Sequence, residues 1–313
     1  MEVIVIGSFM MDFVIHTPRA PKNGETIIGS SFSRFPGGKG ANQAVAAARL
    51  GGYVTMIGKL GLDQFGEEFI DTLKKEKINT QFILQDEQYA TGVGFVTLEK
   101  NGDNRIVVVP GANMNYKIDD LNNIENLIKE AKILLVQLEM DLDMIQKAVS
   151  YAAENQVPVI LNPAPAPIQR LDSNLLKHVT YLTPNETELE ILTGIKVISN
   201  EDAEAGARLL IGKGVKNVVV TLADKGSLLV NQSGTKYIPG FPVNPVDSVA
   251  AGDAFNGALA VGSMNGKSLI EVIQFANAVG ALTVTKKGAI PSLPSIKEVE
   301  NFIKDFENRA AIK

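Results

Sequence analysis

The sequence contains no cysteine and no tryptophan, and it has only two histidines among its 313 residues. Without cysteine the chain can form no disulfide and offers no thiolate to a metal, which is typical of proteins kept in a reducing compartment. Its N-terminus, MEVIVIGSFMMDF, lacks the basic start and the cleavage site of a signal peptide. We therefore expect a cytoplasmic protein.

Long apolar runs and an excess of positive charge are also missing. No stretch approaches the roughly 20 apolar residues that a membrane-spanning helix needs. The formal net charge is -5, so the chain lacks the overall basic field that holds a nucleic acid. With 45% hydrophobic and 21% charged residues, the composition is that of a soluble globular protein without a membrane or nucleic-acid partner.

Apolar, β-branched runs alternate with segments of helical periodicity. The runs predict strands buried on both faces, and they cover residues 2–6, 133–138, 158–161, 179–182, 217–222 and 227–230. Helices are expected between most of them, for example at 141–154 and 201–213. This alternation predicts an α/β protein with a mainly parallel sheet and helices on both of its faces.

Residues of about 10–36 and 89–110 show a different pattern, with alternating strands interrupted by glycine and proline. Two such stretches could pair into a small antiparallel sheet that forms a lid. The alternative is that they are edge strands of the main sheet. No linker divides the chain, so we expect one α/β domain over residues 1–313 with the lid inserted in it.

A glycine turn, DSVAAGDAF at 247–255, runs directly into a predicted helix. The first amides of a helix lack intrahelical partners and lie at the positive end of its dipole, so the turn predicts an anion site. Asp253 could accept a proton from a hydroxyl while the turn amides stabilise a phosphoryl group; these amides belong to Ala250, Ala251 and Gly252. The alternative is that Asp253 only caps the helix.

A second glycine segment, FPGGKGANQAVAAARL at 35–50, leads into an alanine-rich helix from about residue 41. Its spacing matches neither a Walker A loop nor a Rossmann fingerprint. Gly38 permits close approach of the backbone to a polyhydroxy ligand, and Lys39 and Asn42 offer donors to hydroxyl oxygens. The alternative is a tight turn with no ligand.

Together these segments resemble the ribokinase family, also called the PfkB carbohydrate kinases. The resemblance extends over some 290 residues and rests on GSFMMD (7–12), PGGKGANQAVAAARLG (36–51), TGVGFV (91–96), LVQLE (135–139), LNPAPA (161–166), TPNETE (183–188), VTLADKG (220–226), VDSVAAGDAFNGAL (246–259) and VTKKGAIPS (284–292). It implies a three-layer α/β/α sandwich with a β lid. It also implies an ATP-dependent kinase that phosphorylates the terminal 5-hydroxyl of D-ribose.

The resemblance also implies site residues. The sugar would contact Asp12, Gly38, Lys39, Asn42 and Glu139, with Asp253 as the base. The nucleotide would contact Asn185, Thr221, Ala223, Gly226 and Asn277. Magnesium would be held through water by Asn185 and Glu188, whose alternative roles are a helix N-cap and an ordinary surface carboxylate. Potassium would lie beside the anion turn, near Asp247, Val249, Thr283, Gly288 and Ser292.

Two positions depart from the family pattern. Ala223 replaces a usual glycine, and its methyl group changes the fit of the backbone to the nucleotide there. Met10 replaces an asparagine that bonds a ribose hydroxyl, and in this the chain resembles deoxyribokinases. An apolar side chain should tolerate the absence of that hydroxyl, so 2-deoxyribose is the rival substrate. Alternatively, Met10 only fills space.

Other functions stay open at this point. Fructose or a nucleoside could be the substrate, and a non-catalytic sugar sensor could use the same fold. Because the family's lids often pack against each other, we also expect a homodimer formed through the lid.

Overall fold

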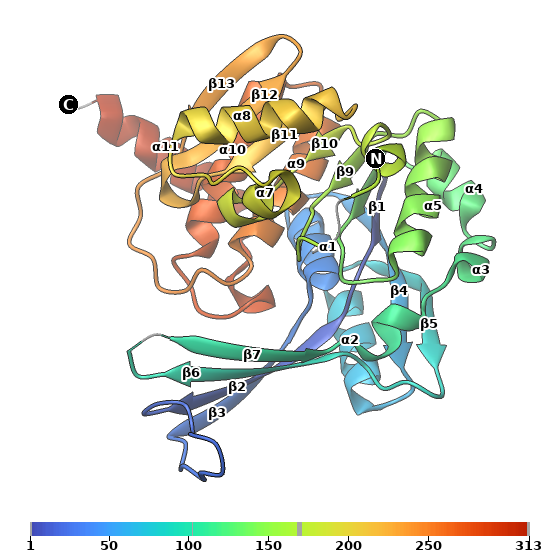
Figure 1. Ribbon diagram of the computed structural model, residues 1–313, viewed down its shortest axis with the longest axis vertical. Helices are drawn as coiled ribbons and strands as arrows, with labels where there is room; N and C mark the ends of the chain where they lie inside the picture. The colour runs from blue at the N-terminus through green and yellow to red at the C-terminus, as the bar shows by residue number, and fades with distance from the viewer. Residues whose placement is uncertain (1, 102, 168–170, 312–313) are drawn as a thin grey trace.

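The computed structural model describes residues 2–101, 103–167 and 171–311, and its centre is a twisted sheet (Figure 1). Within these residues nine strands form the sheet, in the spatial order β13 (Gly234–Pro239), β12 (Gly226–Asn231), β11 (Asn217–Thr221), β10 (Tyr181–Leu182), β9 (Val159–Leu161), β8 (Ile133–Val136), β1 (Glu2–Ile6), β4 (Tyr53–Gly61) and β5 (Asn79–Asp86). The pairs from β5 through β11 are parallel, and β12 and β13 continue the sheet antiparallel. The predicted mainly parallel sheet is confirmed.

Helices cover both faces of this sheet, because successive side chains of a strand point to opposite faces. In β1, Val3 and Val5 enter one apolar core while Ile4 and Ile6 enter the other. The first core is closed by α1 (Lys39–Arg49), α2 (Gln64–Lys75), α9 (Ala251–Ser263), α10 (Leu269–Thr283) and α11 (Ile296–Ala311). The second is closed by α3 (Ile118–Leu121), α4 (Glu125–Glu130), α5 (Leu142–Glu154), α6 (Ser173–Leu176), α7 (Glu186–Thr193) and α8 (Asn200–Gly212). The three-layer sandwich is therefore confirmed.

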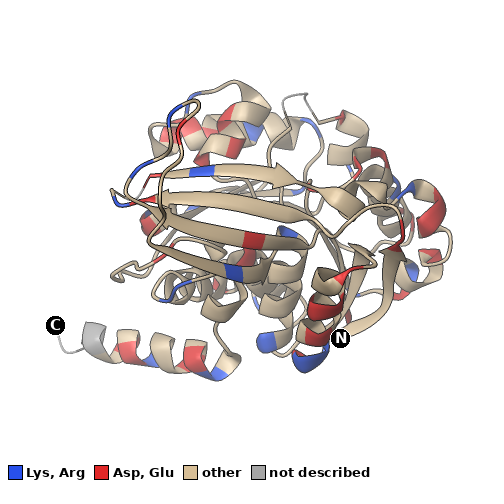
Figure 2. Ribbon diagram, turned by 90° about the horizontal axis from the view of Figure 1, so that it is seen from below, with Lys and Arg blue, Asp and Glu red and all other residues tan. Residues whose placement is uncertain are grey.

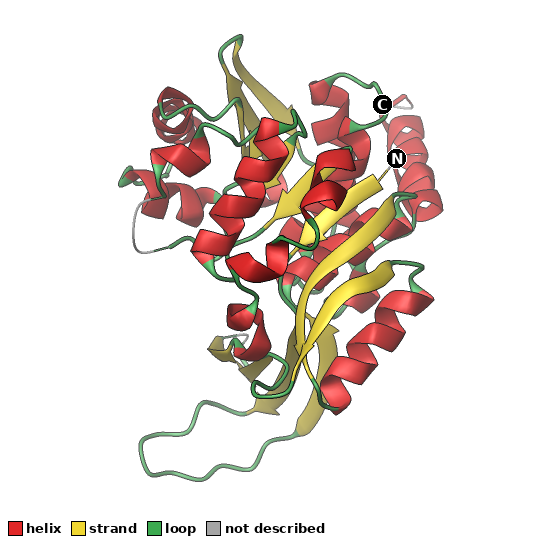
Figure 3. Cartoon of the chain, turned by 90° about the vertical axis from the view of Figure 1, so that its right-hand side faces the viewer, coloured by secondary structure: helices red, strands yellow, loops and turns green. Residues whose placement is uncertain are grey.

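A second, smaller sheet contains β3 (Ser31–Gly37), β2 (Met10–Thr17), β6 (Val93–Glu99) and β7 (Asn104–Val109), in that order. The outer pairs are antiparallel, whereas the central pair β2 and β6 is parallel because each strand leaves the main body in the same direction. Its strands carry few charges (Figure 2). The sheet projects below the helical layers (Figure 3), as the lid prediction requires, and the alternative of edge strands in the main sheet is wrong.

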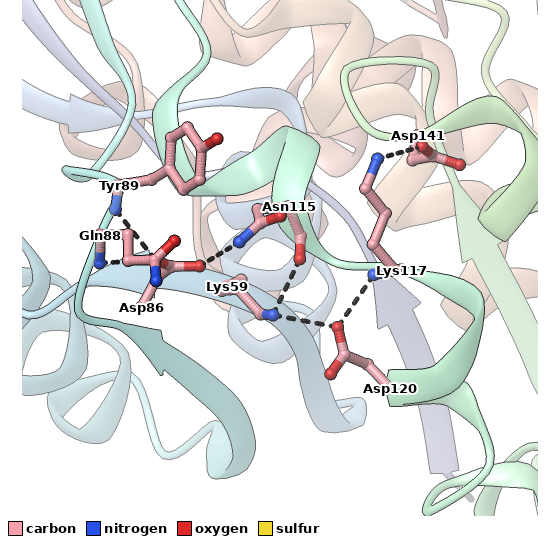
Figure 4. A network of polar contacts seen from close by, with 8 residues as sticks. All are labelled: Lys59, Asp86, Gln88, Tyr89, Asn115, Lys117, Asp120 and Asp141. Atoms are coloured by element: carbon pink, nitrogen blue, oxygen red, sulfur yellow. Dashed lines mark hydrogen bonds and ion pairs between the residues drawn. The ribbon is translucent and has the colours of Figure 1, made fainter.

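The base of the lid is tied to the body by a polar network (Figure 4). Lys59 of β4 donates to the backbone oxygen of Asn115 at 2.8 Å and to Asp120 Oδ2 at 3.0 Å. The Asn115 amide donates to Asp86, whose other oxygen accepts the backbone amides of Gln88 and Tyr89. The chain thus enters β6 and returns from β7, through η1 (Gly111–Asn115), at fixed points.

Membrane insertion finds no support in the helices. Across residues 2–101, 103–167 and 171–311, none combines the length and the apolar composition that crossing a bilayer takes.

Candidate active site

Asp253 lies in the first turn of α9, at the helix entrance that the sequence predicts. Ala250, the N-cap, has φ +61°, a left-handed conformation that turns the chain into the helix. The first bond of the helical ladder runs from the Ala254 amide to the Ala250 oxygen at 2.8 Å. Among the described residues, the amides of Gly252 and Asp253 have no protein acceptor, which is the electrostatic character of an anion site.

The expected set of donors changes slightly in the structure. The Ala251 amide makes a long 3.4 Å bond to the Ser248 oxygen, so its donor is partly used. Gly252 is exposed, and a Cβ added to it would meet no heavy atom within 4 Å. Glycine here is therefore not required by packing within the protein, and it leaves open space above two free amides.

The carboxylate of Asp253 is 8% exposed and is held by two amides from α1. Asn42 Nδ2 donates to Oδ2 at 2.9 Å, and Gln43 Nε2 donates to Oδ1 at 3.0 Å. Burial raises the pKa of Asp253 above its usual range, although Lys39 and both amides act in the opposite direction. A base with a raised pKa is suited to accept a proton near neutral pH.

Asp12, on β2, lies between two glycines of neighbouring lid strands. A Cβ at Gly37 would come within 2.6 Å of Asp12 Oδ2, and one at Gly94 within 2.5 Å of Oδ1. Burial, followed by repulsion from Glu139, raises the pKa of Asp12 to about 7 against the attraction of Lys39. The sequence did not single out Gly94, yet the carboxylate fits only because Gly94 has no side chain.

Lys39 begins α1 and is surrounded by carboxylates. Burial lowers its pKa, but four carboxylates together outweigh burial and raise it, so the ammonium stays charged; they are Asp253, Glu139, Glu188 and Asp12. The structure thus brings the predicted sugar-binding and metal-binding carboxylates into one electrostatic cluster around a single cation.

Glu139, which follows β8, caps the start of α1. Its Oε2 accepts the Lys39 amide at 3.1 Å and the hydroxyl of Ser8. Gly38 has φ +87°, and a Cβ there would come within 2.6 Å of the Met10 nitrogen. Only glycine therefore fits this position. Sequence reasoning missed Ser8, which is buried and lies in the short loop between β1 and β2.

Met10 and Asn42 complete the sugar side of the site. Met10 is buried, and its Cγ would lie 3.6 Å from a Cβ at Gly94, so it shares a face of the lid with Asp12. Asn42 Oδ1 is buried and has no partner among the described residues. An unpaired buried acceptor is costly, and a ligand hydroxyl would satisfy it.

The predicted magnesium residues both begin α7, where they form a capping box. The Glu188 amide donates to Asn185 Oδ1 at 2.8 Å, and Glu188 Oε2 accepts the Asn185 amide at 2.9 Å. The capping alternative for Asn185 is therefore present in the structure. Within the part of the chain that the structure describes, Glu188 Oε1 has no hydrogen-bond donor, and burial raises the pKa of Glu188.

The predicted nucleotide residues lie around the turn that joins β11 to β12. Thr221 forms an isolated bridge with Asn185, which places it beside the capping box. Ala223 has φ +52°, so the departure from glycine puts a side chain on a left-handed residue. Gly226 has φ +107° and is the first residue of β12.

Asn277 of α10 is buried, and its side-chain amide is fully used within the protein. Its oxygen accepts from Ser227 at 2.6 Å, and its NH₂ group donates to the backbone oxygens of Ile238 and Pro239.

The predicted potassium segment is held together by Asp247. Its oxygens accept the amides of Val249 at 3.0 Å and of Gly288 at 2.9 Å, which joins the loop before α9 to the loop after α10. Thr283 and Ser292 are fully buried, and their hydroxyls donate to nearby backbone oxygens, those of Val279 and Ala289.

A cavity near the lid lies apart from these residues. It has a volume of about 470 Å³ and is lined by residues at the outer side of the lid base, including Phe65, Tyr89, Thr91 and Val109. Asp253 is not among its lining residues. The candidate site therefore rests on the convergence of side chains under the lid and not on cavity size.

A lid, a helix entrance with free amides and a buried carboxylate beside them define a kinase that acts on an alcohol group. Comparison with known proteins gives the family. A profile of the pfkB family of carbohydrate kinases matches residues 1–296. The chain belongs to this family, and the expected class of enzyme, a sugar kinase, is confirmed.

Individual relatives are similar over nearly their whole length. Ribokinase of Haemophilus influenzae is 40% identical over 299 residues, covering 96% of this chain and 97% of that protein. Deoxyribokinase of Salmonella typhimurium is 36% identical over 303 residues, covering 97% and 99%. The structure of Arabidopsis thaliana ribokinase complexed with ribose and ATP has a TM-score of 0.91 and 34% identity, covering 96% and 98%.

Proposed function

We propose that this protein transfers the γ-phosphoryl group of ATP to the 5-hydroxyl of D-ribose. The observation that carries the proposal is the position of Asp253, held by Asn42 and Gln43 beside the free amides of a helix entrance. The similarity to ribokinases and to the Arabidopsis complex supports ribose as the sugar.

In the proposed reaction, Asp253 accepts the proton of the sugar 5-hydroxyl while the hydroxyl oxygen forms a bond to the γ-phosphorus of ATP; the bond from that phosphorus to the β,γ-bridging oxygen breaks, and ADP leaves. Asp12 and Asn42 orient the sugar through its other hydroxyls, because the Asp12 carboxylate lies in the same cluster of charges as Asp253 and Asn42 Oδ1 has no partner among the described residues. The Gly252 and Asp253 amides stabilise charge on the phosphoryl oxygens. Closure of the lid would exclude water, which otherwise could accept the phosphoryl group.

Magnesium would be held beside Asn185 and Glu188. The fit is chemical, since Glu188 has a carboxylate oxygen that the capping box leaves unbound, and Mg²⁺ prefers oxygen ligands with retained waters. Bound there, the ion would neutralise charge on the phosphates.

Potassium is proposed for the segment joined by Asp247, near Val249, Thr283, Gly288 and Ser292. The negative Asp247 already fixes the backbone of two loops next to the anion turn. A monovalent cation among their backbone oxygens would hold the turn in its left-handed conformation.

A substrate panel tests the proposal. Purified protein is incubated with ATP and magnesium, with and without potassium, and with ribose, 2-deoxyribose, fructose or adenosine, and sugar phosphate and ADP are quantified. Ribose should give the highest kcat/KM. If the protein binds ribose but forms no phosphorylated product with any acceptor, the proposal is wrong and a sugar sensor is the better interpretation.

Met10 supports 2-deoxyribose as a second candidate substrate, because a buried thioether lies beside Asp12 where an amide could bond a hydroxyl. We expect Met10→Asn to raise the ratio of ribose to deoxyribose kcat/KM about tenfold, since one hydrogen bond in a buried site contributes roughly 1–2 kcal/mol. Met10→Leu is the control that keeps an apolar side chain. An unchanged ratio in Met10→Asn would show that Met10 only fills space.

We also propose that two copies pair through their lids. The lid exposes a set of large apolar side chains, Phe32, Phe95, Ile106, Val107, Val108 and Val109. Phe95 and Val107 are opposite one another in register, and Phe95 stacks on Phe13, so one face of the lid is a continuous apolar surface. Such a surface is typical of an interface, and a second lid would also cover the exposed edge of β7.

A charge on this surface should separate the dimer. Val107 is 64% exposed, and we expect Val107→Lys to weaken dimerisation at least 100-fold, because a lysine in an apolar interface loses hydration without gaining a partner. Analytical ultracentrifugation gives the dissociation constant. Ile198→Lys changes an apolar residue outside the lid that is even more exposed, at 77%, and should leave the dimer intact. A monomeric wild-type protein would refute the pairing.

A further inference from the structure

A ladder of buried amides lies beneath Asp253. It contains Gln137, Gln43 and Asn162, each at most 7% exposed. Gln137 follows β8, and Asn162 follows β9, so both lie at the carboxyl edge of the main sheet, while Gln43 comes from α1. Burying amides in a core is unfavourable unless their hydrogen bonds are made.

The charge of Asp253 fixes the direction of every bond in the ladder. A carboxylate only accepts hydrogen bonds, so Gln43 must turn Nε2 toward Asp253 Oδ1. Its second Nε2 hydrogen then goes to Asn162 Oδ1 at 3.0 Å. Its Oε1 accepts from Gln137 Nε2 at 2.7 Å. Both ends of the Gln43 amide are thus engaged, and its orientation cannot reverse without opposing like atoms.

The ladder also reaches the anion turn. Asn162 Nδ2 donates to the Thr183 oxygen at 3.3 Å, and the Thr183 hydroxyl donates to Asn256 Oδ1 at 2.7 Å. Asn256 Nδ2 donates in turn to the Gly252 oxygen at 2.8 Å. One set of side chains therefore supports both the carboxylate and the backbone beside it.

The far end of the ladder is held by close packing. Gln137 Oε1 has no partner among the described residues, and a Cβ at Gly7 would lie 2.1 Å from it. Gly7 therefore makes the room that Gln137 needs. With its Nε2 turned toward Gln43, Gln137 leaves its Oε1 without a partner among the described residues.

We propose that Gln43, braced by Gln137 and Asn162, is a positioning residue that holds Oδ1 of Asp253 on the core side, so that Oδ2, which also accepts from Asn42, is the atom that takes the sugar proton. The inference rests on the proposed kinase function. It gives a separate role to each of the two side-chain amides near the start of α1. Asn42 contacts Oδ2 from the sugar side, and Gln43 holds Oδ1 from the core.

The test uses two variants of the full chain. Gln43→Met keeps the length of the side chain but removes its donors, and it should lower kcat about 10–100-fold with the KM for sugar changed less than about threefold, because the base is misplaced while the sugar contacts remain. The acid limb of the kcat profile should move up by about one pH unit, since a donor to the charged form is lost. Gln137→Met removes only the brace and should produce the same shifts at about a third of their size.

Thr55→Val is the matched control, because it deletes a buried hydroxyl that bonds Glu2 and Asn79, remote from Asp253. It should leave the pH profile unchanged, and circular dichroism should show all three variants folded. Retention of wild-type kcat in Gln43→Met and Gln137→Met, or a fall in kcat with an unmoved acid limb, overturns the inference. If in addition Asp253→Asn is inactive, the proposed kinase function still stands; only an inactive wild-type protein refutes that function.

Discussion

Asp253→Asn should lower kcat by at least about 1,000-fold and leave the affinity for ATP nearly unchanged. General-base catalysis contributes about 100- to 10,000-fold, and an amide oxygen cannot take the proton of a hydroxyl. The new side chain is isosteric, but its NH₂ group would face one of the two donors that now bond the carboxylate, from Asn42 or Gln43. The variant therefore lacks a proton acceptor and holds the side chain of residue 253 less firmly, and both effects lower kcat.

The fall in kcat of Asp253→Asn should not be caused by unfolding of the variant. Burial raises the pKa of Asp253, which means that the native state holds its charge at a cost, so removing the charge should offset the hydrogen bond that asparagine loses and leave the protein folded. Initial rates, nucleotide affinity and Tm are measured together. Asp143→Asn is the control, because Asp143 is likewise in the first turn of a helix, α5, but is exposed. A kcat within threefold of the wild type would remove Asp253 from the mechanism.

Much of the fold could be predicted from local pattern, but β4 and β5 could not. β4 contains Gly58 and Lys59 where a buried strand would have apolar residues. A Cβ at Gly58 would come within 2.6 Å of the Gly7 oxygen and 2.7 Å of the Phe9 ring, so tertiary packing requires the glycine that weakens the sequence signal. β5 is an edge strand with polar residues at both ends.

Residues of the candidate site were predictable where they lie in a recognisable glycine-containing segment at the start of a helix. Asp253 and Gly252 follow from a turn that enters a helix, and Lys39 and Asn42 follow from the glycine segment before α1. Gln43 was not predictable, because its partners Gln137 and Asn162 are 94 and 119 residues away in sequence. Only the parallel order of the strands brings their carboxyl ends together, and a single sequence does not state which strands are neighbours.

The raised pKa of Asp12 likewise could not be predicted from the sequence. The sequence places a carboxylate in the lid, but the two glycines that enclose it come from β3 and β6. Burial, together with the charges of Glu139 and Asp253, raises its pKa to about 7 against the attraction of Lys39. Its ordinary value, which the unfolded chain retains, is 3.8. The native state therefore binds this proton more tightly than the unfolded state.

Asp12→Asn should weaken sugar binding and stabilise the protein without ligand. Ionised Asp12 accepts hydrogen bonds at two oxygens and an amide at one, so the KM for sugar should rise about 10–100-fold. Because the folded pKa is raised, stability falls as pH increases from about 4 to about 7 and the full cost is present above pH 7. The neutral variant escapes that cost, and its Tm at pH 8 should be higher by about 4 °C.

The pH dependence separates this explanation from a packing effect. The advantage of Asp12→Asn in Tm should shrink as the pH is lowered from 7 and vanish near pH 4, where both native and unfolded Asp12 are protonated. In the wild type, the KM for sugar should rise as the pH falls below about 7, because the carboxylate gains a proton. Asp71→Asn, an exposed change on α2, should alter neither property. A gain in Tm that persists unchanged at pH 4 would mean that charge burial is not its cause.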